Sequence, residues 1–355
     1  MKIAHVVDSM EVGGAEMLVA QMCDAQRDMG HTPCVFAIAA LGDIGVRLQS
    51  DGFVVQANVG QHLFDAARNF YRIFNELRPD VVHLHNPTPA IYAALPARMA
   101  GTASIVSTRH SLVAAPRRRV EEIKYAVASL LCDWVVGVCD ATTANLRDMH
   151  SIRPRKIVRI YNGAVPLRRV AKQECPSKSG FLLLYVGRLE PVKNHGLLLQ
   201  AFRLALFSLP NLQLWMVGDG SERKSLENLA TGLGIASQVT FWGQQIDVAP
   251  FFSNADAFVM SSRSEGLPVS LLQGFSLGVP AIVTDVGGMA EAVRMAEAGV
   301  IVSALDPGEM AAAILQLARN DESRNRFSEN AAIAYAAHFS LERMLDAYME
   351  LYCKA

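Results

Sequence analysis

Residues 181–209 read FLLLYVGRLEPVKNHGLLLQAFRLALFSL and join an apolar run to an amphipathic segment through a polar loop. The run Phe181–Gly187 is almost continuously apolar, as in a strand that is buried on both faces of a parallel sheet. The segment His195–Leu209 carries apolar residues at helical spacing. Because this alternation recurs along the chain, we predict an α/β fold with parallel, doubly wound sheets covered by helices.

The same strand–helix alternation is visible on both sides of this stretch. We expect further strands near Ile3–Asp8, Pro33–Ala39, Val81–His85, Ser104–Thr108, Trp134–Val138, Leu212–Gly218, Val239–Trp242, Ala257–Ser261, Ala281–Thr284 and Val300–Ser303. We expect further helices at Ala15–Met29, at Pro307–Ala318 and, after a serine N-cap, at Ser340–Tyr352.

The length of 355 residues suits two domains. The strand–helix pattern lapses over residues 166–180, which are polar, contain two prolines and end on glycine. We therefore predict an N-terminal Rossmann-like domain over 1–165, a linker over 166–180, and a C-terminal Rossmann-like domain over 181–338. Two such domains that face each other enclose a cleft, which is the default ligand site.

Composition excludes several classes of protein. The chain is 51% hydrophobic and 19% charged, the balance of a globular protein with a large core. Neither a signal peptide nor an apolar run of 18 residues is found, and the six cysteines form no C-x-x-C pair. We expect a cytoplasmic protein with reduced thiols, at most attached peripherally to the inner face of a membrane.

A basic run offers a candidate membrane contact. Arg117, Arg118 and Arg119 precede an amphipathic stretch that extends to Leu131. Such a stretch suits an anionic membrane surface. The alternative is a helix packed on the core with a solvated basic start.

Residues that follow strands have the strongest claim to chemistry, because ligands of doubly wound sheets bind beyond the carboxyl ends of the strands. Gly13 and Gly14 follow the first expected strand and open a helix, so their free N–H groups suit a phosphate. The alternative is a plain turn. Gly218-x-Gly220 and Gly287-Gly288 are similar loops, which either line a nucleotide or only turn the chain.

Arg188 and Lys193 form the strongest candidate anion site. They stand five residues apart around a proline turn, at the end of the strand Phe181–Gly187. Both can converge on one anion, and a departing diphosphate needs such cationic partners. The chain has no D-x-D pair to hold a metal on a diphosphate, so we expect no metal site and assign that role to the cations. The alternative is two solvated cations.

Glu265 and Gly266 follow the strand near Ala257–Ser261, and Pro268 suits the first turn of a helix. A carboxylate beside free N–H groups matches the mixture of donors and acceptors that vicinal sugar hydroxyls require. The alternative is an acidic residue that stabilises its own helix.

The histidines leave more alternatives open. His83 and His85 face the same side of one strand, as a metal pair or as structural histidines, and no third ligand is evident nearby in the sequence. His110 follows another strand and is placed to reach the cleft, or it is structural.

Together these motifs resemble glycosyltransferase family 4, whose members have the GT-B fold of two Rossmann-like domains. The resemblance covers most of the chain and rests on the following motifs: Gly13-Gly14-x-Glu16, His85, His110, Asn162-Gly163, Gly187-Arg188-x4-Lys193, Gly218-x-Gly220, Ser264-Glu265-Gly266-Leu267-Pro268 and Gly287-Gly288-x-x-Glu291.

The resemblance implies roles for single residues. Gly13, Gly14, Arg188 and Lys193 would hold the donor diphosphate, with Gly218 lining the nucleotide. Glu265 and the amides of Gly266 and Leu267 would hold the donor sugar, with His110 close to it. The base would lie against the loop after Trp242-Gly243, and the last helix, within 339–355, would cross back to the first domain.

Two positions depart from the family's pattern. Gln273 stands where the family has its second acid, which contacts the ribose, and Ala164-Val165 follow Asn162-Gly163 where many members have an aspartate.

The resemblance implies a retaining, metal-independent transferase that uses a nucleotide-sugar co-substrate and no other cofactor. The donor would be a UDP-sugar carrying a hexose or N-acetylhexosamine, and the acceptor a saccharide or lipid-linked saccharide of the cell envelope. No nucleic-acid partner is expected. The alternatives are a sugar-nucleotide epimerase or phosphorylase on the same scaffold, and a non-catalytic binding protein. A nicotinamide oxidoreductase is disfavoured, because Arg223 replaces the third glycine of its fingerprint.

Overall fold

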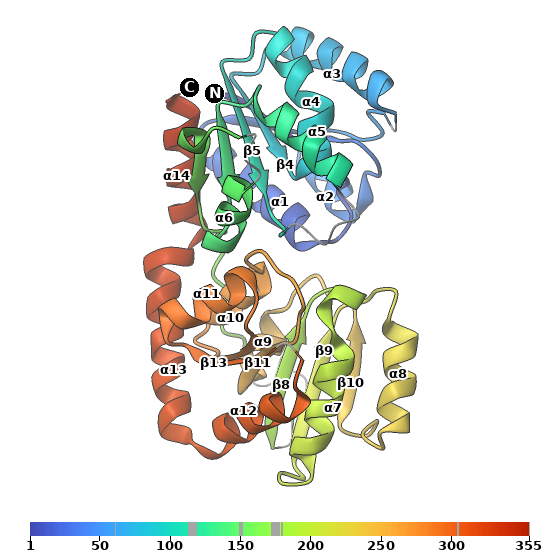
Figure 1. The fold of residues 1–355 in the computed structure, drawn as a ribbon, viewed down its shortest axis with the longest axis vertical. Helices are drawn as coiled ribbons and strands as arrows, with labels where there is room; N and C mark the ends of the chain where they lie inside the picture. The colour runs from blue at the N-terminus through green and yellow to red at the C-terminus, as the bar shows by residue number, and fades with distance from the viewer. Residues whose placement is uncertain are drawn as a thin grey trace. The chain divides into compact units, whose positions relative to one another are not determined.

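The computed structural model describes residues 1–60, 62–112, 119–148, 152–171, 178, 180–303 and 305–354. Three predictions concern residues outside these ranges: the free thiol of Cys175, the part of the linker at 172–177 and 179, and the arginines Arg117 and Arg118. The chain divides into unit 1, residues 1–163 with 341–355, and unit 2, residues 164–340 (Figure 1).

Unit 1 is built on a parallel seven-stranded sheet of order β3-β2-β1-β4-β5-β6-β7. Its strands are β1 Lys2–Val7, β2 Thr32–Ala37, β3 Val54–Gln56, β4 Val81–His85, β5 Ser104–Arg109, β6 Trp134–Gly137 and β7 Ile157–Arg159. Its helices are α1 Gly14–Asp28, α2 Gly42–Ser50, α3 Leu63–Leu77, α4 Pro87–Met99, α5 Arg119–Ser129, α6 Asp140–Asp148 and α14 Leu341–Cys353. Helices α3, α4 and α5 pack side by side, and α1 contacts both α2 and α14.

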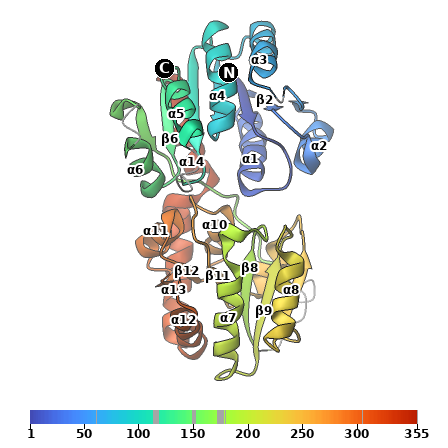
Figure 2. The same cartoon turned by 45° about the vertical axis from the view of Figure 1, so that its right-hand side comes forward.

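Unit 2 is built on a parallel six-stranded sheet of order β10-β9-β8-β11-β12-β13. Its strands are β8 Phe181–Val186, β9 Leu212–Val217, β10 Val239–Gly243, β11 Ala257–Met260, β12 Ala281–Thr284 and β13 Gly299–Val302. Its helices are α7 His195–Leu206, α8 Arg223–Gly232, α9 Ala249–Asn254, α10 Val269–Ser276, α11 Gly287–Ala296, α12 Pro307–Arg319 and α13 Asp321–Ala334. Helices cover both faces of the sheet in each unit (Figure 2).

These two sheets confirm the predicted α/β class with two Rossmann-like units. The strands β3 and β7 were not predicted, because three residues are too few to show a period in the sequence. Pro268 caps α10 from an extended conformation and does not lie in its first turn. In the expected linker, the backbone N–H groups of Leu167 and Val170 donate to Ser276 and Ser253, so this part packs on unit 2.

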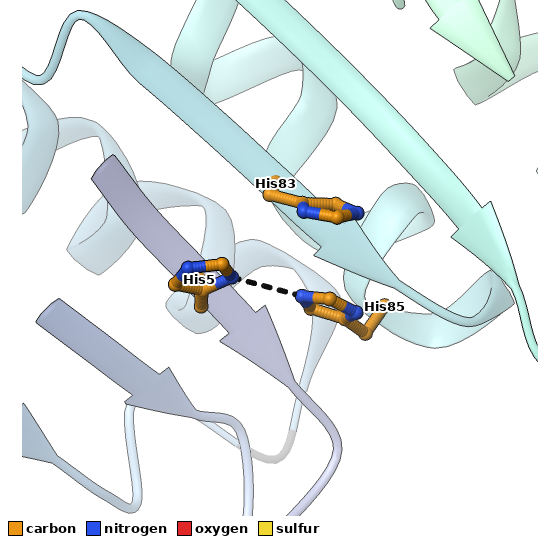
Figure 3. Close-up of side chains that lie close together, drawn as sticks. All are labelled: His5, His83 and His85. Atoms are coloured by element: carbon orange, nitrogen blue, oxygen red, sulfur yellow. Dashed lines mark hydrogen bonds between the residues drawn. The ribbon is translucent and has the colours of Figure 1, made fainter. Parts of the chain in front are cut away.

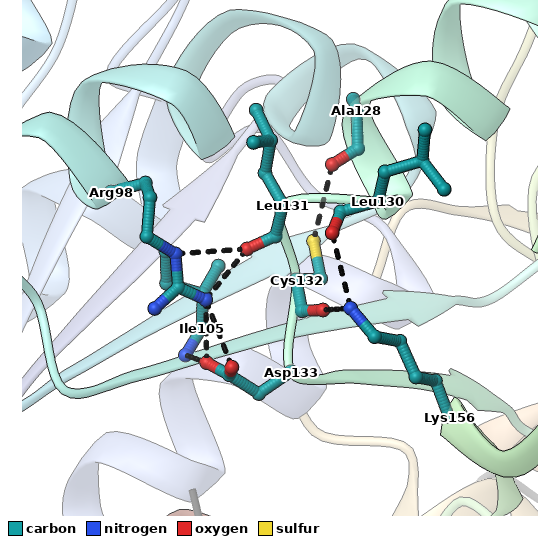
Figure 4. A network of polar contacts seen from close by, with 8 residues as sticks. All are labelled: Arg98, Ile105, Ala128, Leu130, Leu131, Cys132, Asp133 and Lys156. Carbon is teal, nitrogen blue, oxygen red and sulfur yellow. Dashed lines mark hydrogen bonds and ion pairs between the residues drawn. The ribbon is translucent and has the colours of Figure 1, made fainter. Parts of the chain in front are cut away.

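A polar network at the amino ends of β5 and β6 joins α4 and α5 to the sheet of unit 1 (Figure 4). The Arg98 guanidinium donates to the Leu131 carbonyl at 2.7 Å and to the Asp133 carboxylate at 2.9 Å. Asp133 in turn accepts from the Ile105 backbone N–H, and Lys156 donates to the Leu130 carbonyl. Two of its donors, Arg98 and Lys156, bind backbone carbonyls just after the end of α5. Since ligands bind at the opposite, carboxyl ends of such strands, we interpret it as structural.

Candidate active site

The loop pair at the centre of the sheet in unit 2 holds the best-defined cluster of candidate residues. The strand order reverses between β8 and β11. In doubly wound sheets, such a reversal marks the crevice in which ligands bind, here the β8–β11 crevice. The loop after β8 carries Arg188 and Lys193, and the loop after β11 carries Glu265. Ser261 ties the loops together, because its Oγ donates to the Lys193 carbonyl at 3.0 Å.

Lys193 and Glu265 form an ion pair in this crevice, although 72 residues separate them in sequence. Their side chains are only 17% and 11% exposed. The Oε1 atom of Glu265 also accepts from Ser262 Oγ at 2.8 Å, which fixes the carboxylate against the end of β11. The pair therefore offers one fixed carboxylate and one cation at a strand-end crevice. The sequence predicted both charged residues, but it gave no sign of their contact or of Ser262.

Arg188 lies on the same loop as Lys193 but in a different environment. It is exposed and makes no side-chain hydrogen bond or ion pair with any residue in the described ranges. Its backbone is held in place, since Tyr185 Oη donates to the Arg188 carbonyl at 3.0 Å. The neighbouring Glu190, which sequence reasoning missed, accepts from the Ser221 N–H and hydroxyl, and these bonds lower the pKa of Glu190. Arg188 thus keeps its guanidinium available to an anionic ligand.

The glycines that end β8, β9 and β10 let three loops meet backbone to backbone. Gly218 donates its N–H to the Gly243 carbonyl at 2.7 Å, and Gly187 donates to the Val217 carbonyl at 3.0 Å. A Cβ atom on Gly218 would lie 2.0 Å from the Gly187 carbonyl oxygen, where no side chain fits. Gly218 is therefore required for packing, whether or not it also lines a nucleotide.

Gly218→Ala is expected to lower the free energy of unfolding by at least about 1–3 kcal/mol, because it combines this overlap with an unfavourable φ of 133°. Gly232→Ala is the matched control. Gly232 is the last residue of α8, and a Cβ atom on it would have no neighbour within 4 Å. This variant should be about 0.4–1 kcal/mol more stable, because alanine lowers the entropy of the unfolded chain. Urea unfolding of both variants checks this pair, and equal midpoints would contradict the packing role of Gly218.

The segment after Glu265, residues 266–268, precedes α10 and is not part of the helix. Gly266 accepts from the Gly288 N–H at 2.8 Å, which binds it to the start of α11, and Leu267 is buried. Gln273 lies in the second turn of α10 and is half-buried. Because α10 begins at Val269, residues 265–268 are not helical. The distance between Glu265 and Gln273 is therefore not the rise of eight residues along one helix.

In unit 1, the Gly13-Gly14 turn opens α1 as expected, but an acidic group lies over it. A Cβ atom on Gly13 would be 2.2 Å from Glu16 Oε2, whereas Gly14 has no neighbour within 4 Å of its Cβ position. The Glu16 carboxylate thus already faces the start of this helix, where the sequence predicts a phosphate. A phosphate bound there would have to displace or be separated from this carboxylate.

Three histidines of unit 1 lie close together on β1 and β4, namely His5, His83 and His85 (Figure 3), and His110 follows β5. The rings of His83 and His85 are 4.0 Å apart, as expected for neighbours on one face of a strand. The structure adds a third histidine that was not evident near them in the sequence, because His5 on β1 pairs in register with His83 on β4. One ring nitrogen from each of His5, His83 and His85 lies within 4.8 Å of the other two. His110 is joined to His85 by a hydrogen bond of 3.1 Å. Aligning the strands in their doubly wound order would have found His5.

Comparison with known sequences identifies the family. The model of the family described as Glycosyltransferase Family 4 matches residues 12–166, and that of Glycosyl transferases group 1 matches residues 169–333. The chain belongs to glycosyltransferase family 4. Both matches together include the strand-end loops described above.

Two curated relatives are glycosyltransferases by name. The chain is 34% identical to the lipopolysaccharide core biosynthesis glycosyltransferase LpsE of Rhizobium meliloti over 51% of its length, and it spans about half (52%) of LpsE. It is 25% identical to the UDP-Gal:alpha-D-GlcNAc-diphosphoundecaprenol alpha-1,3-galactosyltransferase of Escherichia coli, with 80% of this chain and 78% of that protein covered.

The solved structure of HepE from Anabaena in complex with UDP and glucose superposes on the chain with a TM-score of 0.84. The two chains are 19% identical, and each is covered completely. This similarity confirms the GT-B fold of the family member described here. Within the described residues, no helix has the length and apolar character needed to cross a membrane.

Proposed function

We propose that this family 4 protein transfers a hexose or N-acetylhexosamine from a UDP-sugar to a saccharide or lipid-linked saccharide of the cell envelope. The observation that carries the proposal is the set of charged residues on the loops after β8 and β11: the exposed Arg188 and the Lys193–Glu265 ion pair. The named activities of LpsE and the galactosyltransferase, and the UDP and glucose bound to HepE, support the choice of donor and acceptor class.

In this proposal, Arg188 and Lys193 bind the diphosphate, and Glu265 with the amides of Gly266 and Leu267 binds the donor sugar. The acceptor oxygen forms a bond to the anomeric carbon as the bond to the diphosphate breaks, and a donor phosphate oxygen takes the acceptor proton. Attack on the face that the diphosphate leaves retains the configuration. The cations stabilise the developing charge on the leaving group, so no metal ion is required.

The remaining sequence candidates keep their proposed roles. His110 contacts the donor sugar, and the nucleotide lies against Gly218 and Gly243. Gly14 and the start of α1 contribute to the diphosphate site once the Glu16 carboxylate has moved away from it. We propose a cytoplasmic protein that meets its acceptor at the inner face of the membrane.

The test is product analysis after incubation with UDP-sugars and cell-envelope saccharides in the presence of EDTA. We expect UDP release that depends on the acceptor, and a glycosidic product with the anomeric configuration of the donor. Isomerised donor without acceptor would indicate an epimerase, and sugar phosphate a phosphorylase. Binding of a protein partner without turnover of any nucleotide sugar would indicate a non-catalytic protein.

Gln273→Ala is expected to raise the donor KM with little change in kcat, because the ribose that Gln273 would contact does not change in the transition state. Gln273→Glu is expected to lower KM, since a carboxylate accepts stronger hydrogen bonds from the ribose hydroxyls than an amide oxygen does. Steady-state kinetics with UDP-sugar checks both. An unchanged donor affinity in Gln273→Ala would mean that this residue does not face the ribose.

Peripheral attachment would use one face of α5. Four apolar residues of this region are half or more exposed: Val120, Ile123, Val127 and Leu130. Lys124 is exposed on the same helix and suits anionic lipid headgroups, whereas Leu131 is half-buried and packs on the core. Ile123→Ser/Val127→Ser should therefore reduce co-sedimentation with phosphatidylserine vesicles. Unchanged binding would exclude this face, and Ile333→Ser, at an exposed apolar residue of α13, is the control.

A further inference from the structure

A chain of hydrogen-bonded side chains runs through the interior of unit 1 and ends on His110. It starts at Gln26 in α1, whose Oε1 lies 2.8 Å from His5 Nε2. His5 Nδ1 lies 3.0 Å from His85 Nε2, the contact drawn in Figure 3. His85 Nδ1 in turn lies 3.1 Å from His110 Nε2. The chain thus links a helix, two adjacent strands and the loop after a third strand.

The positions of the protons in this chain follow from counting. Burial lowers the pKa of His5 and His110 to about 4 and that of His85 well below its ordinary value, so each ring is neutral at pH 7 with one N–H. The Gln26 oxygen only accepts, so His5 Nε2 must donate and His5 Nδ1 must accept. His85 then donates from Nε2 and accepts at Nδ1, and His110 donates from Nε2.

The three contacts therefore use all three N–H groups, and His110 Nδ1 is left as a lone pair. This Nδ1 atom is buried and has no hydrogen-bond partner among the described residues. Gln26, at the far end of the chain, thus determines which ring nitrogen of His110 is left able to accept a hydrogen bond.

We propose that His5 and His85 are positioning residues that hold His110 in one tautomer, with its proton on Nε2 and with Nδ1 as a hydrogen-bond acceptor for a hydroxyl of the donor sugar. This inference rests on the proposed function, which places His110 at that sugar. The hydroxyl donates its proton to this nitrogen, which has no hydrogen-bond partner among the described residues. His110 then recognises the donor as a neutral acceptor and takes no part as an acid or a cation.

Three of these histidines, His5, His83 and His85, are close enough together to hold a metal ion. Their hydrogen bonds nevertheless favour the series of hydrogen-bonded side chains over a metal site. His83 uses both ring nitrogens, bonding Tyr352 Oη and Thr108 Oγ1 at 2.7 Å each. A metal would need a lone pair from each of His5, His83 and His85, which would break the His5–His85 bond and one bond of His83. These rings are at most 2% exposed, so the released polar groups would have no water to bind.

The test is ¹⁵N NMR of the full chain labelled at histidine, because protonated and bare ring nitrogens have well-separated shifts. We expect His110 to carry its proton on Nε2 and none on Nδ1 at pH 7, in the free protein and without any substrate. A protonated Nδ1, either alone or in an imidazolium, would overturn the proposal. This readout does not depend on turnover, so it is separate from the test of the proposed function.

Variants of two histidines on one strand give the matched comparison. His85→Leu removes the acceptor for His110, and it should mix the His110 tautomers and lower kcat/KM for the donor about 10- to 100-fold, the usual effect of losing a partner that orients a histidine. His85→Asn keeps an acceptor near the Nδ1 position and should recover most of that loss. His83→Leu is equally buried but makes no bond to His110, so it should leave the tautomer unchanged.

Equal effects of His83→Leu and His85→Leu on the His110 tautomer would contradict a specific positioning role. Stoichiometric binding of Zn²⁺ that His5→Leu abolishes would also overturn the proposal and make the group a metal site. If His85→Leu does not fold, His85→Asn and the wild-type spectrum still decide the question.

Discussion

Lys193→Ala is expected to lower kcat about 100- to 1000-fold, the usual effect of removing one group that stabilises charge developing in a transition state. Lys193 lies in the β8–β11 crevice with its side chain only 17% exposed, so its charge is weakly screened by water. Arg188→Ala should act in the same direction, because its guanidinium makes no ion pair within the described residues. Both variants should bind UMP nearly as well as the wild type, since UMP lacks the second phosphate. Steady-state kinetics and UMP titration measure the two effects.

Lys178→Ala is the matched control for this prediction. Lys178 also forms an ion pair in unit 2, with Asp256 at 2.7 Å, but this pair lies at the amino end of the sheet, where Asp256 accepts from the Leu182 N–H. Its loss should leave kcat within about twofold, as surface pairs contribute little. If Lys193→Ala and Arg188→Ala kept the turnover of Lys178→Ala, the diphosphate assignment would be wrong.

Glu265→Ala should produce the second large effect, a fall in kcat of at least about 100-fold. The carboxylate is fixed by Lys193 and by the Ser262 hydroxyl, so it can hold the sugar hydroxyls without reorganising. Glu265→Gln should retain part of the activity, because the amide keeps an acceptor oxygen but loses the charge. The donor KM should change less than kcat, in contrast to Gln273→Ala.

Loss of stability must be separated from loss of function at this pair. Each single alanine variant leaves a mostly buried partner unpaired, which costs about 1–3 kcal/mol. The double variant Lys193→Met/Glu265→Leu replaces the pair with apolar side chains and should recover much of that stability. It should remain inactive. Recovery of turnover together with stability would show that the pair is only structural.

The fold class could be predicted from the sequence because the patterns that indicate strands and helices are local. Each of the eleven strands expected between Ile3 and Ser303 overlaps an observed strand, since each is a buried apolar run between turn residues. The strands β3 and β7 escaped because three residues form no pattern. The placement of Lys193 and Glu265 on loops that follow strands was also predictable, because each comes after a buried apolar run.

The contacts within the sites were not predictable, because they depend on the register of distant strands. His5 carries no motif, and it joins the other histidines only through the pairing of β1 with β4. The contact of Gly218 with the Gly187 carbonyl depends likewise on how two loops cross. The Glu16 carboxylate over Gly13 shows a further limit, since a glycine turn before a helix does not reveal which group occupies it.

The most direct test of the central claim, a diphosphate site at Arg188 and Lys193, is thermal unfolding in EDTA with UMP, UDP and a UDP-sugar. A ligand at 100 times its Kd adds about 2.7 kcal/mol to the free energy of unfolding. We expect UDP and the UDP-sugar to raise the Tm of the wild type well above UMP at equal concentration. In Arg188→Ala/Lys193→Ala, this advantage over UMP should disappear while the effect of UMP remains. Equal shifts by UMP and UDP in the wild type, or an advantage of UDP that survives in the double variant, would contradict the claim.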